Sequence, residues 1–187
     1  LVPANIDLSA AEIQMVNEVG REHTLARALR PVRRDYDFII IDCQPSLGLL
    51  TVNALACSQG VIIPMECEYF SLRGLALLTD TVEKVRDRIN FDLDIVGILV
   101  TMFDRRTTHA REVMDRVVEV FGERVFDTVI TRTVRFPETS VAGEPIITWA
   151  PNSQGADQYR NLALTAVGTH DLPPTAGYLE GAHNALR

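Results

Sequence analysis

The sequence predicts an α/β fold, with a three-layer, mostly parallel sheet and helices on both faces. Short apolar runs alternate with helical patterns of ten to twenty residues, which is typical of parallel βαβ units. The apolar runs lack polar alternation, as expected for strands covered on both faces. With 187 residues and 47% hydrophobic content, the chain can bury one sizeable core.

The first third of the chain predicts two helical pieces and one strand. Residues 7–20 carry apolar side chains at helical spacing and end at Gly20, and Ser9 with Glu12 has the spacing of a capping box. Residues 21–32 form a second helical piece that Pro31 closes. The run FIII at 38–41 then predicts a buried strand that leads into Asp42.

The remaining two thirds repeat strand and helix in turn. Their periodicity predicts helices over residues 49–58, 71–90, 108–122 and 153–168, and strands over 60–65, 93–103 and 124–130. Gly74 inside the second of these helices is interpreted as allowing close packing. The Pro/Gly-rich residues 170–187 predict a flexible carboxyl-terminal tail, which leaves 1–169 as one domain.

Composition narrows the function classes. A net charge of −7 argues against a chain that coats nucleic acid or membrane through bulk charge, although a local basic patch is compatible with it. Three cysteines without a CxxC pair indicate a reducing, cytoplasmic setting. No apolar run reaches the roughly twenty residues of a membrane span, and the four histidines lack zinc-site spacing.

Asp42 is the first candidate for chemistry. It follows three isoleucines, so the pattern places its carboxylate where a buried strand emerges at the rim of the sheet. A carboxylate there needs a partner, because an unpaired buried charge is costly. It either helps to hold Mg²⁺, as the Walker B aspartate of a P-loop NTPase does, or caps the following turn.

Five successive blocks of sequence point to a family. YDFIIIDCQPSLGLLTVNAL, VIIPMECEYFSLRGLALL, GILVTMFDRRTTHAREV, VFDTVITRTVRFPETSVAGEPI and APNSQGADQYRNLA occur in this order. Together they resemble the ParA/Soj-type partition ATPases, the deviant Walker group that includes MinD, and the resemblance extends over about residues 1–168. The resemblance implies a P-loop NTPase-like sheet whose amino-terminal strand and P-loop are missing from these 187 residues.

The resemblance also implies roles for particular residues. It gives Asp42 a catalytic role, holding Mg²⁺ through its water shell, and it places Pro45 and Gly48 beside the phosphates of ATP. Thr101, Met102 and Asp104 would flank the adenine, and Arg132 and Arg135 would contact DNA. On the residues alone, Met102 can equally be a core methionine, and the arginines can be solvated surface charges. Gln44, Thr131 and Gln154 depart from the family pattern, where prolines and a basic residue are usual.

The resemblance implies a whole activity as well. It implies an ATPase that needs ATP and Mg²⁺, forms a homodimer and binds double-stranded DNA nonspecifically. A ParB-like partner would activate it, and the protein would be cytoplasmic and nucleoid-associated. Membrane binding of the MinD kind is not expected. No G-x-x-x-x-G-K-[ST] stretch occurs in the 187 residues, so this segment alone is expected to be inactive. Either the P-loop lies before Leu1 in a longer protein, or the chain is a non-enzymatic, protein-binding relative.

Overall fold

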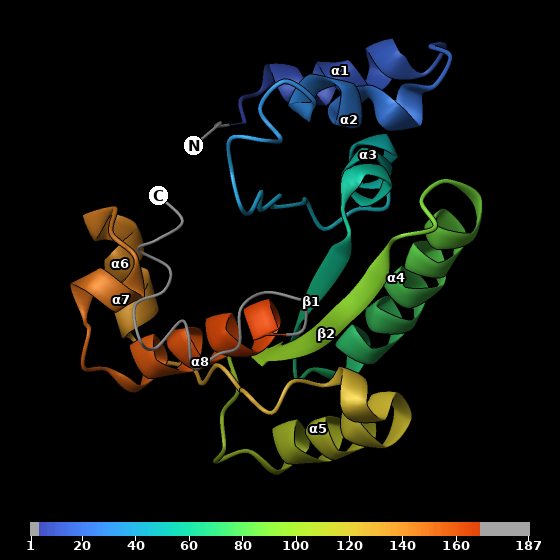
Figure 1. Ribbon diagram of the computed structural model, residues 1–187. Helices are drawn as coiled ribbons and strands as arrows, with labels where there is room; N and C mark the ends of the chain where they lie inside the picture. The colour runs from blue at the N-terminus through green and yellow to red at the C-terminus, as the bar shows by residue number, and fades with distance from the viewer. Residues whose placement is uncertain (1–3, 169–187) are drawn as a thin grey trace. The chain divides into compact units, whose positions relative to one another are not determined.

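The computed structural model describes residues 4–168 (Figure 1). Within that range the chain forms two compact units, one of residues 4–61 and 76–95 and the other of 62–75 and 96–168. No helix among the described residues has the length and apolar character needed to cross a membrane.

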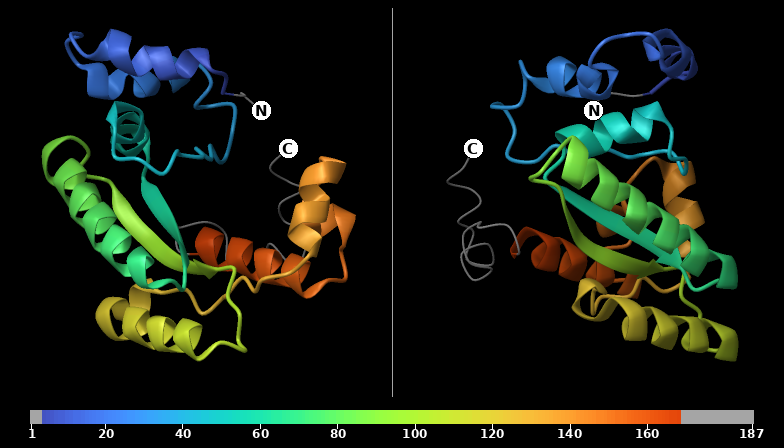
Figure 2. Two further views of the ribbon diagram at one scale, coloured as in Figure 1. Left: turned by 180° about the vertical axis from the view of Figure 1, so that it is seen from behind. Right: turned by 90° about the vertical axis from the view of Figure 1, so that its right-hand side faces the viewer.

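The sheet is built from two strands joined by a long helix. β1 (Gly60–Glu66) pairs with β2 (Asp94–Thr101), and α4 (Tyr69–Arg88) connects them. Such a crossover returns the chain to the same end of the sheet, so both strands run in one direction (Figures 1 and 2). The predicted α/β class with a parallel sheet is therefore confirmed.

The strand expected over 124–130 forms only as isolated parallel bridges along β2. Val125 pairs with Ile98, and Thr131 pairs with Phe103. Between them, the amide of Phe126 donates to the Ile98 carbonyl at 3.0 Å and that of Ile130 donates to Val100 at 2.9 Å. This segment thus extends the hydrogen bonding of the sheet without becoming a regular strand.

The strand predicted at 38–41 is wrong. Residues 38–41 form no regular secondary structure and have no ladder partner among the described residues. Phe38 is 47% exposed and Ile40 is 92% exposed, so the apolar run is not buried. The apolar pattern indicated a segment suited to burial. A strand also needs a neighbouring strand with which its backbone groups can exchange hydrogen bonds.

The first unit holds three helices and a turn of 3₁₀ helix around a buried asparagine. They are α1 (Asp7–Met15), η1 (Arg21–His23), α2 (Thr24–Leu29) and α3 (Leu49–Cys57). Asn53 of α3 is 3% exposed; its amide donates to the carbonyls of Arg21 and Leu49 and accepts from the amide of Leu25. One side chain therefore ties α3 to the segment that precedes it.

Two details of the predicted first helix are corrected. The helix ends at Met15 rather than at residue 20. Ser9 and Glu12 do not form a capping box, because the Ser9 hydroxyl donates to the Ile6 carbonyl and Glu12 accepts from the amide of Leu49. Glu12 thus serves the amino terminus of α3 instead of that of its own helix.

The second unit packs α6 and α8 against an apolar cluster. Its helical elements are α5 (Thr108–Phe121), η2 (Gly122–Arg124), α6 (Arg135–Ala142), α7 (Ile146–Trp149) and α8 (Gln154–Gly168). Leu99, Phe126 and Ile130 form the buried centre, with Val96, Phe136 and Leu162 packed against it. Helices α5 and α8 match the predicted 108–122 and 153–168, whereas α6 and α7 were not predicted. The expected tail at 170–187 lies outside the described residues.

Candidate functional site

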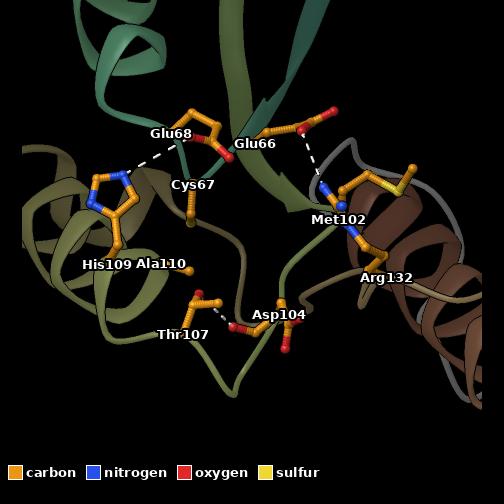
Figure 3. Close-up of a pocket in the computed structure, with 9 residues that line it drawn as sticks. All are labelled: Glu66, Cys67, Glu68, Met102, Asp104, Thr107, His109, Ala110 and Arg132. Atoms are coloured by element: carbon orange, nitrogen blue, oxygen red, sulfur yellow. Dashed lines mark hydrogen bonds and ion pairs between the residues drawn. The ribbon is translucent and has the colours of Figure 1, made fainter.

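A pocket of about 200 Å³ lies in the second unit, where β1 and β2 end (Figure 3). Ligands of open α/β sheets bind at the carboxyl ends of the strands, so this is the place where a site is expected. Three neighbouring residues stand at the end of β1 and just after it, two follow β2, three come from the loop before α5 and its start, and one follows the bridged segment. In that order they are Glu66, Cys67 and Glu68; Met102 and Asp104; Thr107, His109 and Ala110; and Arg132.

Charged side chains pair across this pocket. Arg132 approaches the carboxylate of Glu66 at 3.9 Å, and His109 approaches Glu68 at 4.0 Å, as Figure 3 shows. All four side chains are about half exposed or more, so these contacts are weak and can rearrange around a ligand. The pocket therefore offers donors from Arg132 and His109, and its three carboxylates, Glu66, Glu68 and Asp104, outnumber its one arginine.

Asp104 is the most firmly held acid of the pocket. Arg106 from the same loop donates two side-chain hydrogen bonds to it at 2.9 and 3.0 Å, and the backbone amide of Arg106 adds a third. These hydrogen bonds lower the pKa of the Asp104 carboxyl from 3.8 to about 2. Asp104 is therefore a fixed, ionised acceptor at neutral pH.

Met102 has an unusual backbone. Its φ of 52° lies in the left-handed region, and it is the one non-glycine residue with positive φ in the described part of the chain. An L-residue there is strained by about 1 kcal/mol or more. The turn lets β2 end at Thr101 while the Met102 side chain lines the pocket (Figure 3).

A second hollow, of about 420 Å³, adjoins the same loop. It shares Asp104 and Arg132 with the first pocket, and it adds Phe103, Arg105, Arg106, Thr131 and Gln154. The predicted Thr101, Met102 and Asp104 and the predicted Arg132 thus come together at one end of the sheet. Thr101 itself lines neither hollow; its hydroxyl points back to the Met65 carbonyl at 3.4 Å.

The two arginines predicted to contact DNA are both ion-paired. Arg132 pairs with Glu66 as described, and Arg135 at the start of α6 pairs with Glu138 at 3.0 Å. Both side chains remain more than half exposed. A DNA role for them stays a prediction.

The residues predicted to lie beside the phosphates belong to the first unit. Asp42, Pro45 and their neighbours are exposed, and Gly48 directly precedes α3. The Asp42 carboxylate forms no hydrogen bond or ion pair with any described residue. The expectation of a buried rim position for Asp42 is therefore wrong, because the segment before it does not join the sheet.

The chemistry of this side fits a hydrated Mg²⁺ held by few protein ligands. Mg²⁺ keeps several waters and is usually bound through one or two carboxylates together with substrate phosphates. The free, solvated carboxylate of Asp42 meets that need. The described residues contain no group of three or more His, Cys, Asp or Glu side chains that could hold a metal.

Gly48 lies close to the side chain of Glu12. A Cβ at this position would collide with the carboxylate of Glu12, which accepts from the amide of the next residue, Leu49. The turn before it is closed by its own contacts, with the Thr51 hydroxyl donating to the Ser46 carbonyl at 2.6 Å. Hydrogen bonds thus hold the Pro45–Gly48 turn at the start of α3.

Sequence reasoning found part of the pocket and missed the rest. It did not predict roles for Glu68, Thr107, His109 or Arg106, which stand at strand ends or in the loop beside the predicted Asp104. A signal was present, because Glu66 and Glu68 directly follow a predicted strand. The pairing of Arg106 with Asp104 needed the loop geometry.

Known proteins match the chain over most of its length. A family model described as "AAA domain" matches residues 1–95. An uncharacterized protein of Mycobacterium tuberculosis is 77% identical over 163 residues, which cover 87% of this chain and 51% of that protein. The sporulation initiation inhibitor protein Soj of Bacillus subtilis is 48% identical over 163 residues, covering 87% of this chain and 64% of Soj.

A solved structure matches the fold as well. The crystal structure of a Mycobacterium smegmatis protein titled cobyrinic acid a,c-diamide synthase, with bound ADP and magnesium, has a TM-score of 0.73 and 39% sequence identity. The match covers 87% of this chain and 59% of that one. The chain thus spans about half to two thirds of the length of the proteins it matches.

Proposed function

Because this chain belongs to the ParA/Soj-type family of partition ATPases, we propose that its protein is an ATPase that positions DNA cargo by an ATP-dependent change of association state. The observation that carries the proposal is the pocket at the ends of β1 and β2. There Met102 and Asp104 of the TMFD stretch lie together with Arg132. The chain covers only part of the length of its relatives, so the proposed activity is that of the whole protein.

The two sides of the site have different proposed tasks. Asp42 would hold Mg²⁺ through its water shell, and the Pro45–Gly48 turn would lie beside the phosphates. Met102 would offer a soft apolar surface to the adenine, and Asp104 would accept a hydrogen bond from the amino group of the base. Its low pKa supports this role, since an ionised carboxylate is a pure acceptor.

The proposed cycle follows from the family. ATP bound with Mg²⁺ would favour a homodimer that binds double-stranded DNA nonspecifically, with Arg132 and Arg135 contributing positive charge. A ParB-like partner would stimulate hydrolysis and release. The protein would act in the cytoplasm, on the nucleoid. Binding and hydrolysis thus bias an equilibrium between states rather than make a metabolite.

The test uses the full-length protein and the variant Asp42→Ala. We expect Mg²⁺-dependent ATP hydrolysis to fall by about tenfold or more, because the metal-side carboxylate is lost. Asp37→Ala is the matched control, since Asp37 is an exposed aspartate five residues earlier in the same segment. It should hydrolyse ATP as the wild type does.

The same preparation separates the alternatives. Binding of a fluorescent ATP analogue is measured with and without Mg²⁺. If the wild-type protein binds no nucleotide, the ATPase proposal fails and a non-enzymatic, protein-binding role takes its place. Mg²⁺-dependent binding that Asp42→Ala leaves unchanged would also contradict the role of Asp42.

A further inference from the structure

Gln158 of α8 holds the backbone beside the pocket. Its side-chain oxygen accepts from the backbone amide of Thr131 at 3.1 Å and from the Thr131 hydroxyl at 3.2 Å. Both residues are partly buried. The backbone amide of Thr131 fixes the orientation of the Gln158 side chain, because the flipped amide would set its NH₂ group against this N–H, which can only donate.

Thr131 needs this partner. In the parallel bridge between Phe103 and Thr131, the amide of Phe103 donates to Ile130 at 3.0 Å and the amide of Arg132 donates to Phe103 at 3.1 Å. The amide of Thr131 points away from β2, as alternate amides of a strand do. Gln158 is the group that satisfies it, and an unmet amide in a partly buried place is costly.

The bridge it secures has pocket residues at both ends. On one strand Phe103 stands between Met102 and Asp104, and on the other Thr131 is followed by Arg132. A shift of Thr131 would therefore move the arginine that lines both hollows. It would also loosen the left-handed turn at Met102, which has strain of its own and relies on its surroundings.

We propose that Gln158 is a positioning residue of the nucleotide site, which, through Thr131, sets Arg132 and the Met102–Asp104 loop for a purine nucleotide. This inference rests on the proposed function. Gln158 lines neither hollow, so it acts through the backbone rather than by touching the ligand. Its effect should therefore fall on nucleotide affinity and leave the chemistry at the phosphates alone.

The test is Gln158→Leu in the full-length protein. Leucine has a similar size and removes the acceptor, so we expect the Kd for a fluorescent ADP analogue and the KM for ATP to rise about three- to tenfold, the worth of a hydrogen bond or two. The kcat at saturating ATP should stay within about twofold. Asn161→Leu, at an exposed position of the same helix, is the control and should change neither value.

Two more variants separate positioning from general stability. Gln158→Glu keeps an acceptor oxygen and should restore the wild-type Kd. Thr131→Val keeps the backbone donor and removes the hydroxyl, so its Kd should lie between those of the wild type and Gln158→Leu. If Gln158→Leu does not fold, Thr131→Val decides the question against the wild type alone: a raised Kd supports the role of Gln158, and an unchanged Kd overturns it.

Each result bears on one proposal. A wild type that binds no nucleotide overturns the proposed function itself. A wild type that binds, together with an unchanged Kd in Gln158→Leu or a Kd in Gln158→Glu as weak as that of the leucine variant, overturns the role of Gln158. A fall in kcat without a change in Kd overturns it too.

Discussion

Asp104 owes its low pKa to one neighbour. The guanidinium and the backbone amide of Arg106 donate to the same carboxylate, which favours its charged form. Arg106 gains in turn, since Asp104 raises its pKa. Both lie at the surface, so the pair is better regarded as setting the charge of a site residue than as stabilising the fold.

The predicted consequence is a carboxylate that resists acid. A carboxyl whose pKa is lowered on folding contributes stability that is complete above its usual pKa and is lost as the pH falls through the folded value. For Asp104 this window runs from about pH 4 down to about pH 2. We expect its carboxyl ¹³C shift to remain that of the ionised form at pH 3.5.

Arg106→Gln tests the cause. Removing the guanidinium should raise the pKa of Asp104 toward 3.8, so that protonation becomes visible near pH 4 in the same NMR titration. Arg105→Gln changes the adjacent exposed arginine of the loop and should leave the titration as it is in the wild type. Equal titration curves for the wild type and Arg106→Gln would contradict the assignment.

At this scale the sequence predicts contiguous motifs better than pairs. TMFD indicated Met102 and Asp104 together, and the structure places both on one pocket with Arg132. The contacts of His109 with Glu68 and of Gln158 with Thr131 join residues 41 and 27 positions apart. No local pattern in the sequence carries such pairs, because they depend on which elements become neighbours.

Gly97 and Gly74 differ in how much space surrounds them. A Cβ at Gly97 in β2 would lie 2.6 Å from two ring carbons of Phe126, which packs in the core of the second unit. Gly74 in α4 has no heavy atom within 4 Å of such a Cβ among the described residues. The interpretation of Gly74 as a close-packing residue is therefore wrong, and Gly97 fills that role.

The pair predicts opposite effects on stability. Gly97→Ala should lower the free energy of unfolding by about 1–3 kcal/mol, because the ring of Phe126 must move in a packed core. Gly74→Ala should raise it by about 0.5–1 kcal/mol, because alanine restricts the unfolded chain and suits a helix. Urea unfolding of both variants measures the change in the free energy of unfolding. A lower free energy of unfolding in Gly74→Ala would contradict the open space found around Gly74.

Element prediction succeeded where periodicity was strong and failed where it was short. The amphipathic pattern of 108–121 identified α5 with its buried Val113 and Val117. The short α6 was not predicted; its Pro137 stands in the first turn, where a backbone donor is not needed. At 38–41 the apolar run predicted a strand, but pairing is a property of two segments.

For the whole molecule, the net charge of −7 sets a condition on DNA binding. An acidic chain can bind DNA only where basic side chains gather locally, and the salt dependence of binding counts the phosphates they neutralise. If Arg135 contacts a phosphate, Arg135→Ala should weaken ATP-dependent binding to any sequence and lower the salt slope by about one per contact.

Arg116 supplies the control for this experiment. It forms the same kind of pair, with Glu119 three residues on, at a similar exposure in α5. Arg116→Ala should keep both the affinity and the slope, measured by filter binding or anisotropy over a range of salt. Equal losses in both variants would assign the effect to general charge rather than to a contact of Arg135.

At Met102, the residue that would stabilise the fold differs from the residue that the proposed pocket needs. Glycine or asparagine would adopt this conformation with less strain and would make the fold firmer, but either would remove the thioether from the pocket wall. Selection for a durable chain and selection for a working pocket thus favour different residues here. If Met102 contacts the base as proposed, its thioether is kept at the cost of this backbone strain.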